Sequence, residues 1–342
     1  MPSAKQSFET RKIAQTGLEI TTLGLGGASL GGIFHEVPED QARATITRAL
    51  DVGITYYDTA PQYGMGRSEH LMGNALRGHR AGNILSTKVG RLMKPFFGER
   101  PKDFAWVGAM PFEQVYDYSY DAIMRSFEDS LQRLGLNKVD ILYVHDIGPM
   151  THGVEANKPL WRQLETGGYK ALQELKSAGV ISAIGLGVNE WEILMEAFKL
   201  GDWDVFLLAG RYTLLEQTSL SPFLTTCLER KCSVVIGGPF NSGILVGGST
   251  WNYDKAPQNI IDRVRALEGV CKDFGIPLPA AALQFPLTHP AVCNVLPGPR
   301  SPQELDGILD WWNIDIPDAL WTAFADQKLV APGTPLPNGK TA

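Results

Sequence analysis

Four ionisable residues stand where apolar stretches of the chain give way to loops. They lie in YYDTAPQYG, ILSTKVG and ILYVHD, as Asp58, Tyr63, Lys88 and His145. A single residue of this kind is more often a solvated loop residue or a satisfied structural group. Four of them after three successive apolar stretches favour catalysis, because the loops that follow parallel strands build active sites. The sequence therefore predicts one site at which the four side chains converge.

The four residue types suit proton transfer. A tyrosine phenol has an ordinary pKa of about 10, so Tyr63 is an efficient base at neutral pH only if a nearby cation favours the phenolate. Lys88 can supply that cation, and Asp58 is the counter-ion that keeps a buried lysine charged and in place. His145 can hydrogen-bond the reacting oxygen and orient it, or relay a proton. No metal is needed for this chemistry.

Alternating apolar runs and amphipathic segments supply the elements that would position these residues. Eight runs are typical of strands, at 23–26, 55–58, 84–88, 139–145, 182–187, 204–208, 233–236 and 293–297. Helical patterns lie between them, at 40–53, 68–78, 120–136, 169–180, 192–201 and 221–231. Eight parallel strands joined by right-handed helical crossovers close into a barrel. We therefore predict an α/β fold, a single (β/α)8 TIM barrel domain spanning 1–342 with its core at 8–330.

Other segments depart from the repeat. The stretch KIAQTGLEIT, at 12–21, predicts an N-terminal hairpin that turns at Thr16-Gly17 and caps the bottom of the barrel. Long loops are predicted at the C-terminal face, at 90–117, 146–160 and 241–254. Such loops usually carry substrate contacts. The composition of 331–342 predicts a mobile tail.

Composition narrows the class of protein. The chain has 342 residues, 44% of them hydrophobic and 20% charged, which is enough for a large core. A net charge of -6 without long Lys/Arg runs argues against a nucleic-acid binder and favours a small diffusible substrate. No stretch has the pattern of a signal peptide or a membrane span, so we expect a cytoplasmic location. The four cysteines lack disulfide or zinc spacings, and nothing in the sequence defines an oligomeric state.

The motifs resemble a known family. GITYYDTAPQYGMGRSEHLMGNAL, STKVG, SLQRLGLNKVDILYVHD, IGLGVNEW and VLPGPRSPQEL are similar to the aldo-keto reductase superfamily over nearly the whole chain. LLAGRYTLLEQ, FNSGIL and SFEDSLQRLGL resemble its branch of aldose 1-dehydrogenases, L-fucose dehydrogenase, L-galactose dehydrogenase and pyridoxal 4-dehydrogenase. The resemblance implies an NAD(P)-dependent oxidoreductase in which a tyrosine handles the proton and a nicotinamide carries the hydride. It gives the catalytic roles to Tyr63, Lys88, Asp58 and His145.

The resemblance also implies where the cofactor binds. The glycines of GLGGASLGG, at 24–32, lack the spacing of a dinucleotide fingerprint. The loops GGPFNSGIL and PGPRSPQEL follow the last two strands and lead toward helices, where backbone N–H groups can cradle phosphate. By resemblance the first holds the pyrophosphate, the second holds the adenosine end, and Asn189 grips the nicotinamide carboxamide. The implied cofactor contacts are Gly27, Ala28, Asp58, Asn189, Pro239, Asn241, Ser242, Gly243, Leu245, Gly298, Arg300, Ser301 and Glu304.

The loop after the last strand bears on the choice between NAD and NADP. Relatives that use NADP place basic residues where this chain has Gly298 and Glu304, and Arg300 is the cation that remains. A carboxylate accepts hydrogen bonds from ribose hydroxyls but repels a phosphate, so Glu304 favours NAD. NADP stays open, because Arg300 could accommodate the phosphate and Glu304 could face solvent.

The substrate follows from the chemistry that the resembled branch shares, which is oxidation of a cyclic hemiacetal to a lactone. We expect an aldopyranose such as L-fucose, L-galactose or D-arabinose, bound by Tyr63, His145, Asp146 and Trp106. Pyridoxal, oxidised to 4-pyridoxolactone, is the alternative. Two other classes stay open, a Schiff-base aldolase with Lys88 as its nucleophile and a non-catalytic nucleotide-binding subunit.

Overall fold

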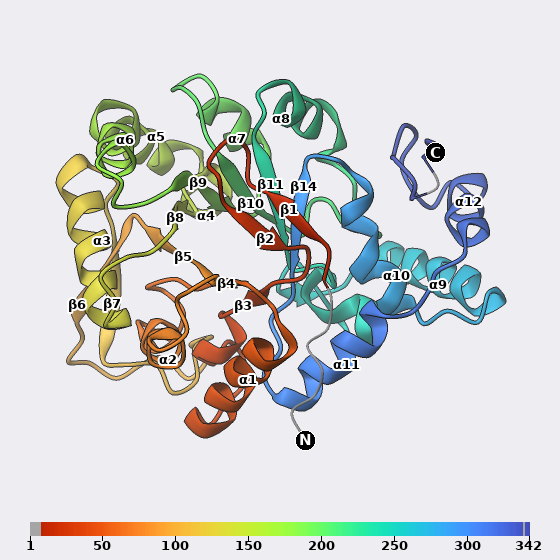
Figure 1. Cartoon of the computed structure of the whole chain (residues 1–342), viewed down its shortest axis with the longest axis horizontal. Helices are drawn as coiled ribbons and strands as arrows, with labels where there is room; N and C mark the ends of the chain where they lie inside the picture. Colours follow the sequence, from red (N-terminus) through yellow and green to blue (C-terminus); the bar gives the residue numbers. More distant parts are fainter. Residues whose placement is uncertain (1–7, 338) are drawn as a thin grey trace.

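The computed structural model describes residues 8–337 and 339–342. Figure 1 shows strands in the middle of the molecule and helices around them. The central strands are β3 (Leu25–Gly26), β4 (Tyr56–Asp58), β5 (Ile84–Val89), β8 (Ile141–His145), β9 (Ala183–Val188), β10 (Val205–Ala209), β11 (Ser233–Gly237) and β14 (Val292–Leu296). Each lies where the sequence predicted a strand, with ends displaced by a few residues at most.

The eight strands are parallel and pair in the order β3, β4, β5, β8, β9, β10, β11 and β14. The sheet closes where Leu23 forms a parallel bridge with Val295. At this seam the N–H of Gly24 donates to the carbonyl of Val295 at 3.0 Å, and the N–H of Val295 donates to the carbonyl of Thr22 at 2.8 Å. Closure removes the sheet edges, and the predicted (β/α)8 barrel is confirmed.

Helices cover the outside of the barrel. They are α1 (Glu39–Val52), α2 (Arg67–Leu76), α3 (Tyr120–Leu134), α4 (Pro149–His152), α5 (Val154–Gln163), α6 (Tyr169–Ser177), α7 (Glu192–Ala197), α8 (Thr225–Glu229), α9 (Gln258–Asp273), α10 (Leu278–Gln284), α11 (Pro302–Trp312) and α12 (Asp318–Asp326). Short helical turns are η1 (Ser29–Gly31), η2 (Leu164–Gly168), η3 (Leu220–Leu224), η4 (Asn241–Val246) and η5 (Phe285–Thr288). Within the described residues, no helix has the length and apolar character needed to cross a membrane.

Helix α3 illustrates how the sequence sets these elements. The side chain of Ser119 accepts a hydrogen bond from the N–H of Ala122 and caps the start of the helix. The helix ends at Gly135, whose φ of 60° lies in the left-handed region that glycine tolerates. Between these signals Ile123 and Phe127 recur at helical spacing and are buried.

The N-terminal hairpin closes one end of the barrel, as predicted. Strands β1 (Thr10–Lys12) and β2 (Glu19–Thr21) are antiparallel. Ile13 and Ile20, which flank the turn, are fully buried among side chains of the barrel interior. The N–H of Ala14 donates to Ser233 Oγ at 2.8 Å, at the first residue of β11. The hairpin therefore covers the amino-terminal ends of the strands.

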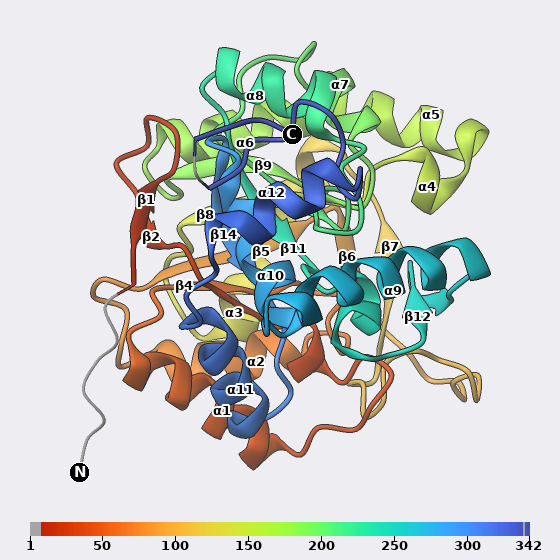
Figure 2. The same cartoon turned by 90° about the vertical axis from the view of Figure 1, so that its right-hand side faces the viewer.

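The long segments at the opposite end contain regular structure that the sequence did not predict. Residues 90–117 form an antiparallel hairpin of β6 (Arg91–Pro95) and β7 (Phe112–Tyr116). The loop at 241–254 contains η4 and leads into the hairpin of β12 (Thr250–Trp251) and β13 (Asp254–Lys255). Figure 2 shows β1 and β2 on one side of the molecule and β6, β7 and β12 toward the other.

The C-terminal segment differs from the mobile tail that its composition predicted. Thr334 and Leu336 are buried, and Pro335 forms an antiparallel bridge with Thr341. The N–H of Ala342 donates to the carbonyl of Thr334 at 2.9 Å. Local backbone hydrogen bonds and the burial of Leu336 against the core outweigh the turn-rich composition.

Candidate active site

The structure brings the four ionisable residues together. Asp58 ends β4, Lys88 lies in β5 and His145 ends β8, and these three strands are neighbours. Lys88 Nζ donates to Asp58 Oδ2 at 2.6 Å and to the carbonyl of Thr59 at 2.9 Å. The same Nζ lies 4.6 Å from the centre of the Tyr63 ring, and the ring centres of Tyr63 and His145 are 5.8 Å apart. Parallel strands explain this arrangement, because their carboxyl ends meet at one edge.

Tyr63 is held by close packing of two loops. A Cβ added to Gly31 would lie 2.6 Å from the carbonyl carbon of Tyr63, so only glycine allows the approach. Trp106, from the segment between β6 and β7, stacks on Tyr63 with ring centres 5.6 Å apart and planes at 28°. Trp106 is buried, whereas Tyr63 stays partly exposed. The indole therefore shields the tyrosine on one side and leaves it accessible elsewhere.

Asp58 and Lys88 form a buried ion pair, each with 2% of its side chain exposed. Burial raises the pKa of Asp58 and lowers the pKa of Lys88, and the attraction between the two charges opposes both shifts. Asp58 also accepts a hydrogen bond from Ser86 Oγ at 2.6 Å. Loss of one partner would leave the other charge buried and uncompensated.

The protonation of Tyr63 differs from our expectation. We expected Lys88 to favour the phenolate, but burial raises the pKa of Tyr63 well above its ordinary value, and the carboxylates of Asp58 and Asp146 add to that rise. Arg91 opposes the rise without cancelling it. Desolvation of the anion outweighs the neighbouring cations, so Tyr63 is a neutral phenol in the protein alone.

His145 is also neutral. Burial, together with the cations of Arg91 and Lys88, lowers the pKa of His145 well below its ordinary value. Its Nε2 lies 3.5 Å from Asp146 Oδ2, and Tyr118 donates a hydrogen bond to its backbone carbonyl at 2.8 Å. Its Nδ1 is buried without a hydrogen-bond partner among the described residues. A neutral imidazole held in this way is a hydrogen-bonding group rather than a strong acid.

Asp146 is paired with Arg91, a residue that the sequence motifs did not indicate as part of the site. Arg91 begins β6, is almost fully buried, and bonds Asp146 Oδ2 and Gln114 Oε1. Asp146 has a φ of 46°, a conformation that aspartate tolerates better than most residues. The sequence signal for Arg91 was its position, three residues after Lys88.

The predicted cofactor residues lie at the carboxyl ends of the strands, on the same side as the four ionisable residues. Gly27 and Ala28 follow β3, Asn189 follows β9, and Gly298 follows β14. A Cβ on Gly298 would lie 3.0 Å from Ser29 Oγ, so the loops after β3 and β14 are in close contact. The remaining members lie after β11 or after β14: Pro239, Asn241, Ser242, Gly243, Leu245, Arg300, Ser301 and Glu304.

The loop after β11 has features that fit a polar ligand. Asn241 is buried, and its Nδ2 donates to the carbonyl of Gly210 at 3.2 Å, while its Oδ1 has no partner among the described residues. Asn241, Ser242 and Gly243 all have positive φ values, of 46°, 61° and 99°. Asn189 Nδ2 donates to the hydroxyl of Tyr253 at 3.3 Å. These donors and acceptors fit a nicotinamide dinucleotide, and the contact with Tyr253 was not anticipated.

Arg300 and Glu304 bind each other in the loop after β14. The N–H, Nε and Nη2 of Arg300 donate to the Glu304 carboxylate at 2.8, 2.9 and 2.5 Å. Partial burial raises the pKa of Glu304, but the hydrogen bonds from Arg300 lower it more, so the net shift is downward. Ser301 Oγ accepts from the N–H of Glu304 at 3.1 Å and caps α11.

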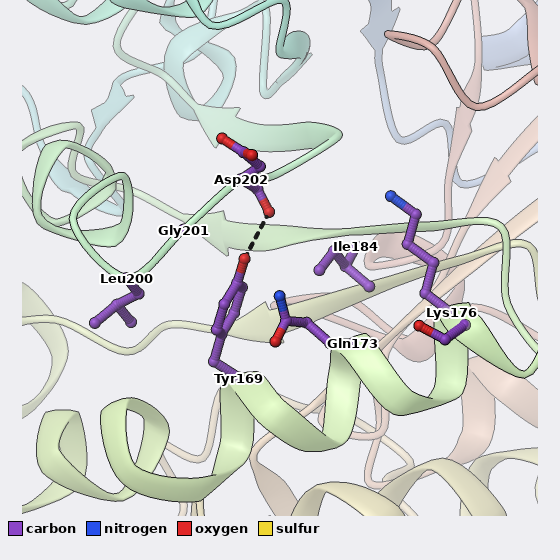
Figure 3. Close-up of a pocket in the computed structure, with 8 residues that line it drawn as sticks. Tyr169, Gln173, Lys176, Ile184, Leu200, Gly201 and Asp202 are labelled. Carbon is purple, nitrogen blue, oxygen red and sulfur yellow. Dashed lines mark hydrogen bonds between the residues drawn. The ribbon is translucent and has the colours of Figure 1, made fainter.

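A cavity of about 660 Å³ lies away from this site. Figure 3 shows its lining between α6, Ile184 of β9 and residues 200–202, which precede β10. There the hydroxyl of Tyr169 donates to the carbonyl of Asp202 at 2.9 Å. None of the candidate catalytic or cofactor residues lines it, so the cavity does not define the active site.

The chain is an oxidoreductase that belongs to the Aldo/keto reductase family, whose profile matches residues 22–326. It is 44% identical to pyridoxal 4-dehydrogenase of Microbacterium luteolum, over 95% of this chain and 99% of the relative. It is 34% identical to D-threo-aldose 1-dehydrogenase of a Pseudomonas species, over 93% and 97%. The holo aldo-keto reductase AKR11C1 of Bacillus halodurans shares the fold, with a TM-score of 0.72 and 24% identity over 95% and 97%.

Family membership makes the chain an NAD(P)-dependent enzyme. Together with the surroundings of Lys88, it argues against the Schiff-base aldolase. A Schiff-base lysine must present a neutral, accessible amine to its substrate. Lys88 instead is 2% exposed and gives hydrogen bonds to Asp58 and to Thr59. The lysine is therefore placed to supply charge rather than to attack a carbonyl.

Proposed function

We propose that this enzyme oxidises a cyclic hemiacetal to a lactone and passes the hydride to NAD. The observation that carries the proposal is the environment of Tyr63, a partly exposed phenol above the buried Lys88–Asp58 pair and beside the neutral imidazole of His145. The two relatives with the highest identity given above are named as dehydrogenases of an aldose and of pyridoxal, and both substrates form cyclic hemiacetals.

Each residue has a defined part in this reaction. A bound nicotinamide would take up the hydride from the hemiacetal carbon and would add positive charge to the site. Tyr63 first releases its own proton to solvent and then, as a phenolate, accepts the hydroxyl proton of the hemiacetal, so that the C–O single bond becomes the lactone carbonyl. Lys88 stabilises the phenolate that must form on Tyr63, and Asp58 holds Lys88 in place. His145 hydrogen-bonds the reacting oxygen and orients it toward Tyr63.

An aldopyranose is the substrate class that the charges favour. Arg91 fixes Asp146 Oδ2 beside His145 Nε2, and the Asp146 side chain remains 18% exposed. A fixed carboxylate accepts hydrogen bonds, which suits a sugar hydroxyl adjacent to the anomeric carbon. Pyridoxal is the second candidate, supported by the 44% identity to a pyridoxal 4-dehydrogenase and by the aromatic surroundings that Trp106 and Tyr116 give the site.

The direct test is incubation of the purified enzyme with NAD or NADP and a panel of L-fucose, L-galactose, D-arabinose and pyridoxal. Formation of the reduced cofactor is followed by its absorbance, and the product is identified as a lactone by mass spectrometry. Turnover of a sugar or of pyridoxal to a lactone supports the proposal. Reduced cofactor with an open-chain acid as the first product, or no turnover with any member, contradicts it.

Replacing Asp146 with asparagine tests its contact with the sugar. We expect kcat/KM for the preferred aldose to fall about ten- to hundredfold, because a hydrogen bond to a charged group contributes about 1.5–3 kcal/mol. The analogue that lacks the hydroxyl next to the anomeric carbon should be oxidised equally by both proteins. Asp103→Asn, which changes an exposed carboxylate in the segment between β6 and β7, is the control. An equal loss with the analogue would show that Asp146 does not bind this hydroxyl.

We propose that the preference for NAD over NADP depends on Glu304. Its carboxylate binds the guanidinium of Arg300 and adds negative charge near the proposed site of the cofactor's adenosine. We expect a higher kcat/KM with NAD than with NADP. Glu304→Arg should shift that ratio toward NADP by about ten- to hundredfold, because a cation replaces an anion beside the extra phosphate. Glu304→Gln, which frees Arg300 without adding charge, should give an intermediate shift. A wild-type preference for NADP, or no movement in either variant, would refute this assignment.

A further inference from the structure

Three hydroxyl side chains form a polar row beneath Asp58, inside the barrel. They are Tyr56 of β4, Ser86 of β5 and Tyr143 of β8, all fully buried on three neighbouring strands. The interior of such a barrel is usually filled by branched apolar side chains. Buried hydroxyls destabilise a fold unless they are hydrogen-bonded. The two phenols therefore call for a reason beyond packing.

The row is continuous. Tyr143 and Tyr56 have their hydroxyl oxygens 3.1 Å apart, Tyr56 lies 3.0 Å from Ser86 Oγ, and Ser86 Oγ lies 2.6 Å from Asp58 Oδ1. The other carboxylate oxygen of Asp58 accepts from Lys88. Asp58 thus joins the hydroxyl row to the ion pair at the active site.

The row has a direction when Asp58 is ionised. A carboxylate only accepts, so Ser86 donates its single proton to Asp58 at 2.6 Å in preference to the carbonyl of Tyr57 at 3.4 Å, and Ser86 then accepts from Tyr56. Tyr56 in turn accepts from Tyr143. The much shorter contact of Ser86 Oγ with the carboxylate favours the direction in which every hydroxyl of the row points at Asp58.

We propose that Tyr143, Tyr56 and Ser86 are positioning residues that hold Asp58 as an anion, and that Asp58 in turn keeps Lys88 charged below Tyr63. Aligned hydrogen bonds of this kind polarise one another. The hydroxyl of Tyr143 therefore stabilises the Asp58 carboxylate through the hydroxyls of Tyr56 and Ser86. The effect on the reaction depends on the function proposed above. The effect on the ionisation of Asp58 does not.

Other ionisable groups also lie around the Lys88–Asp58 pair. Glu69 of α2 and Asp146 after β8 both favour the cation of Lys88. Cys293 of β14 faces the two phenols, and burial raises its pKa to about 12, so it stays a neutral thiol. The carboxylate of Asp58 is therefore the group whose ionisation the hydroxyl row controls.

The first test measures Asp58 itself, by NMR of the protein labelled at the aspartate carboxyl carbons, with the signal assigned by its loss in Asp58→Asn. We expect the wild-type carboxyl to be ionised at neutral pH. Ser86→Ala should raise its titration midpoint by about one pH unit, the scale of a lost hydrogen bond to a charge. A protonated wild-type carboxyl at neutral pH, or an unmoved midpoint in Ser86→Ala, overturns the proposal whether or not the enzyme oxidises hemiacetals.

The second test compares pH profiles of kcat for oxidation. In Ser86→Ala, Tyr56→Phe and Tyr143→Phe the rise of kcat should move to higher pH, because a weaker Lys88 cation raises the pKa of Tyr63. Ser86→Thr retains a hydroxyl and should restore the wild-type profile. Tyr57→Phe is the control, since that buried hydroxyl donates to the carbonyl of Ile54 at 2.7 Å and lies outside the row.

Folding is checked separately, by thermal denaturation and by cofactor binding in each variant. Tyr143→Phe removes the hydroxyl farthest from the active site, so its profile remains informative if Ser86→Ala is unstable. Wild-type profiles in both phenylalanine variants of the row, or an equal shift in Tyr57→Phe, would reduce the three hydroxyls to packing residues.

Discussion

Replacement of Tyr63 by phenylalanine is expected to lower kcat by about 10²- to 10⁴-fold, the usual contribution of a general acid–base group. The substitution removes only the hydroxyl and keeps the ring that stacks on Trp106. Cofactor affinity should therefore be nearly unchanged. Steady-state kinetics measures kcat, and quenching of tryptophan fluorescence by added cofactor measures the cofactor affinity.

The control for Tyr63→Phe is Tyr57→Phe. It removes the hydroxyl of the residue next to Asp58, which faces away from the site and donates to the carbonyl of Ile54. It should retain the wild-type kcat. A loss of less than tenfold in Tyr63→Phe would assign the proton transfer to another group, and His145 would be the first to examine because its ring lies next to Tyr63.

Replacement of Lys88 by methionine is expected to destabilise the fold by about 3–5 kcal/mol at neutral pH, since it leaves the charge of Asp58 buried without its partner. The unpaired carboxyl would have a folded-state pKa above its unfolded value. Protonation then stabilises the folded form, so the loss should shrink as the pH falls below that raised pKa. Urea denaturation at several pH values measures this dependence.

The double variant Lys88→Met with Asp58→Asn separates charge from packing. Removing the carboxylate charge should recover much of the lost stability without restoring turnover, because the cation beside Tyr63 is still missing. If Lys88→Met is as stable as the wild type at neutral pH, the pair contributes little to folding. If it also retains the wild-type pH profile of oxidation, Lys88 does not stabilise the phenolate.

The barrel could be predicted because its signals are local. Runs such as ILSTK and VDILYVH are short, apolar and followed by polar loops, and the alternation with helical patterns leaves few topologies. Asp58, Lys88 and His145 could be placed together because each ends or nearly ends a strand, and parallel strands share one edge. Their convergence follows from the repeat and requires no knowledge of side-chain packing.

What the sequence did not predict depends on contacts between distant segments. The hairpin of β6 and β7 lacks a long alternating pattern, and Arg91 acquires its importance from Asp146, 55 positions further along. The pKa of Tyr63 could not be predicted either. Residue types suggested that the Lys88 cation would lower the pKa of Tyr63, whereas burial raises it.

The pairing of Ile33 with Trp106 joins the loop after β3 to the insertion at 91–116, which includes the hairpin of β6 and β7. That insertion supplies Trp106 and Arg91, whereas Tyr63, Lys88 and His145 stand on the barrel strands or directly after them. The groups that surround the site and the groups proposed to transfer the proton thus come from separate stretches of chain. We expect exchange of residues 91–116 between relatives to change the surroundings of Tyr63 and Asp146 through Trp106 and Arg91, while Tyr63, Lys88 and His145 keep their places on the barrel.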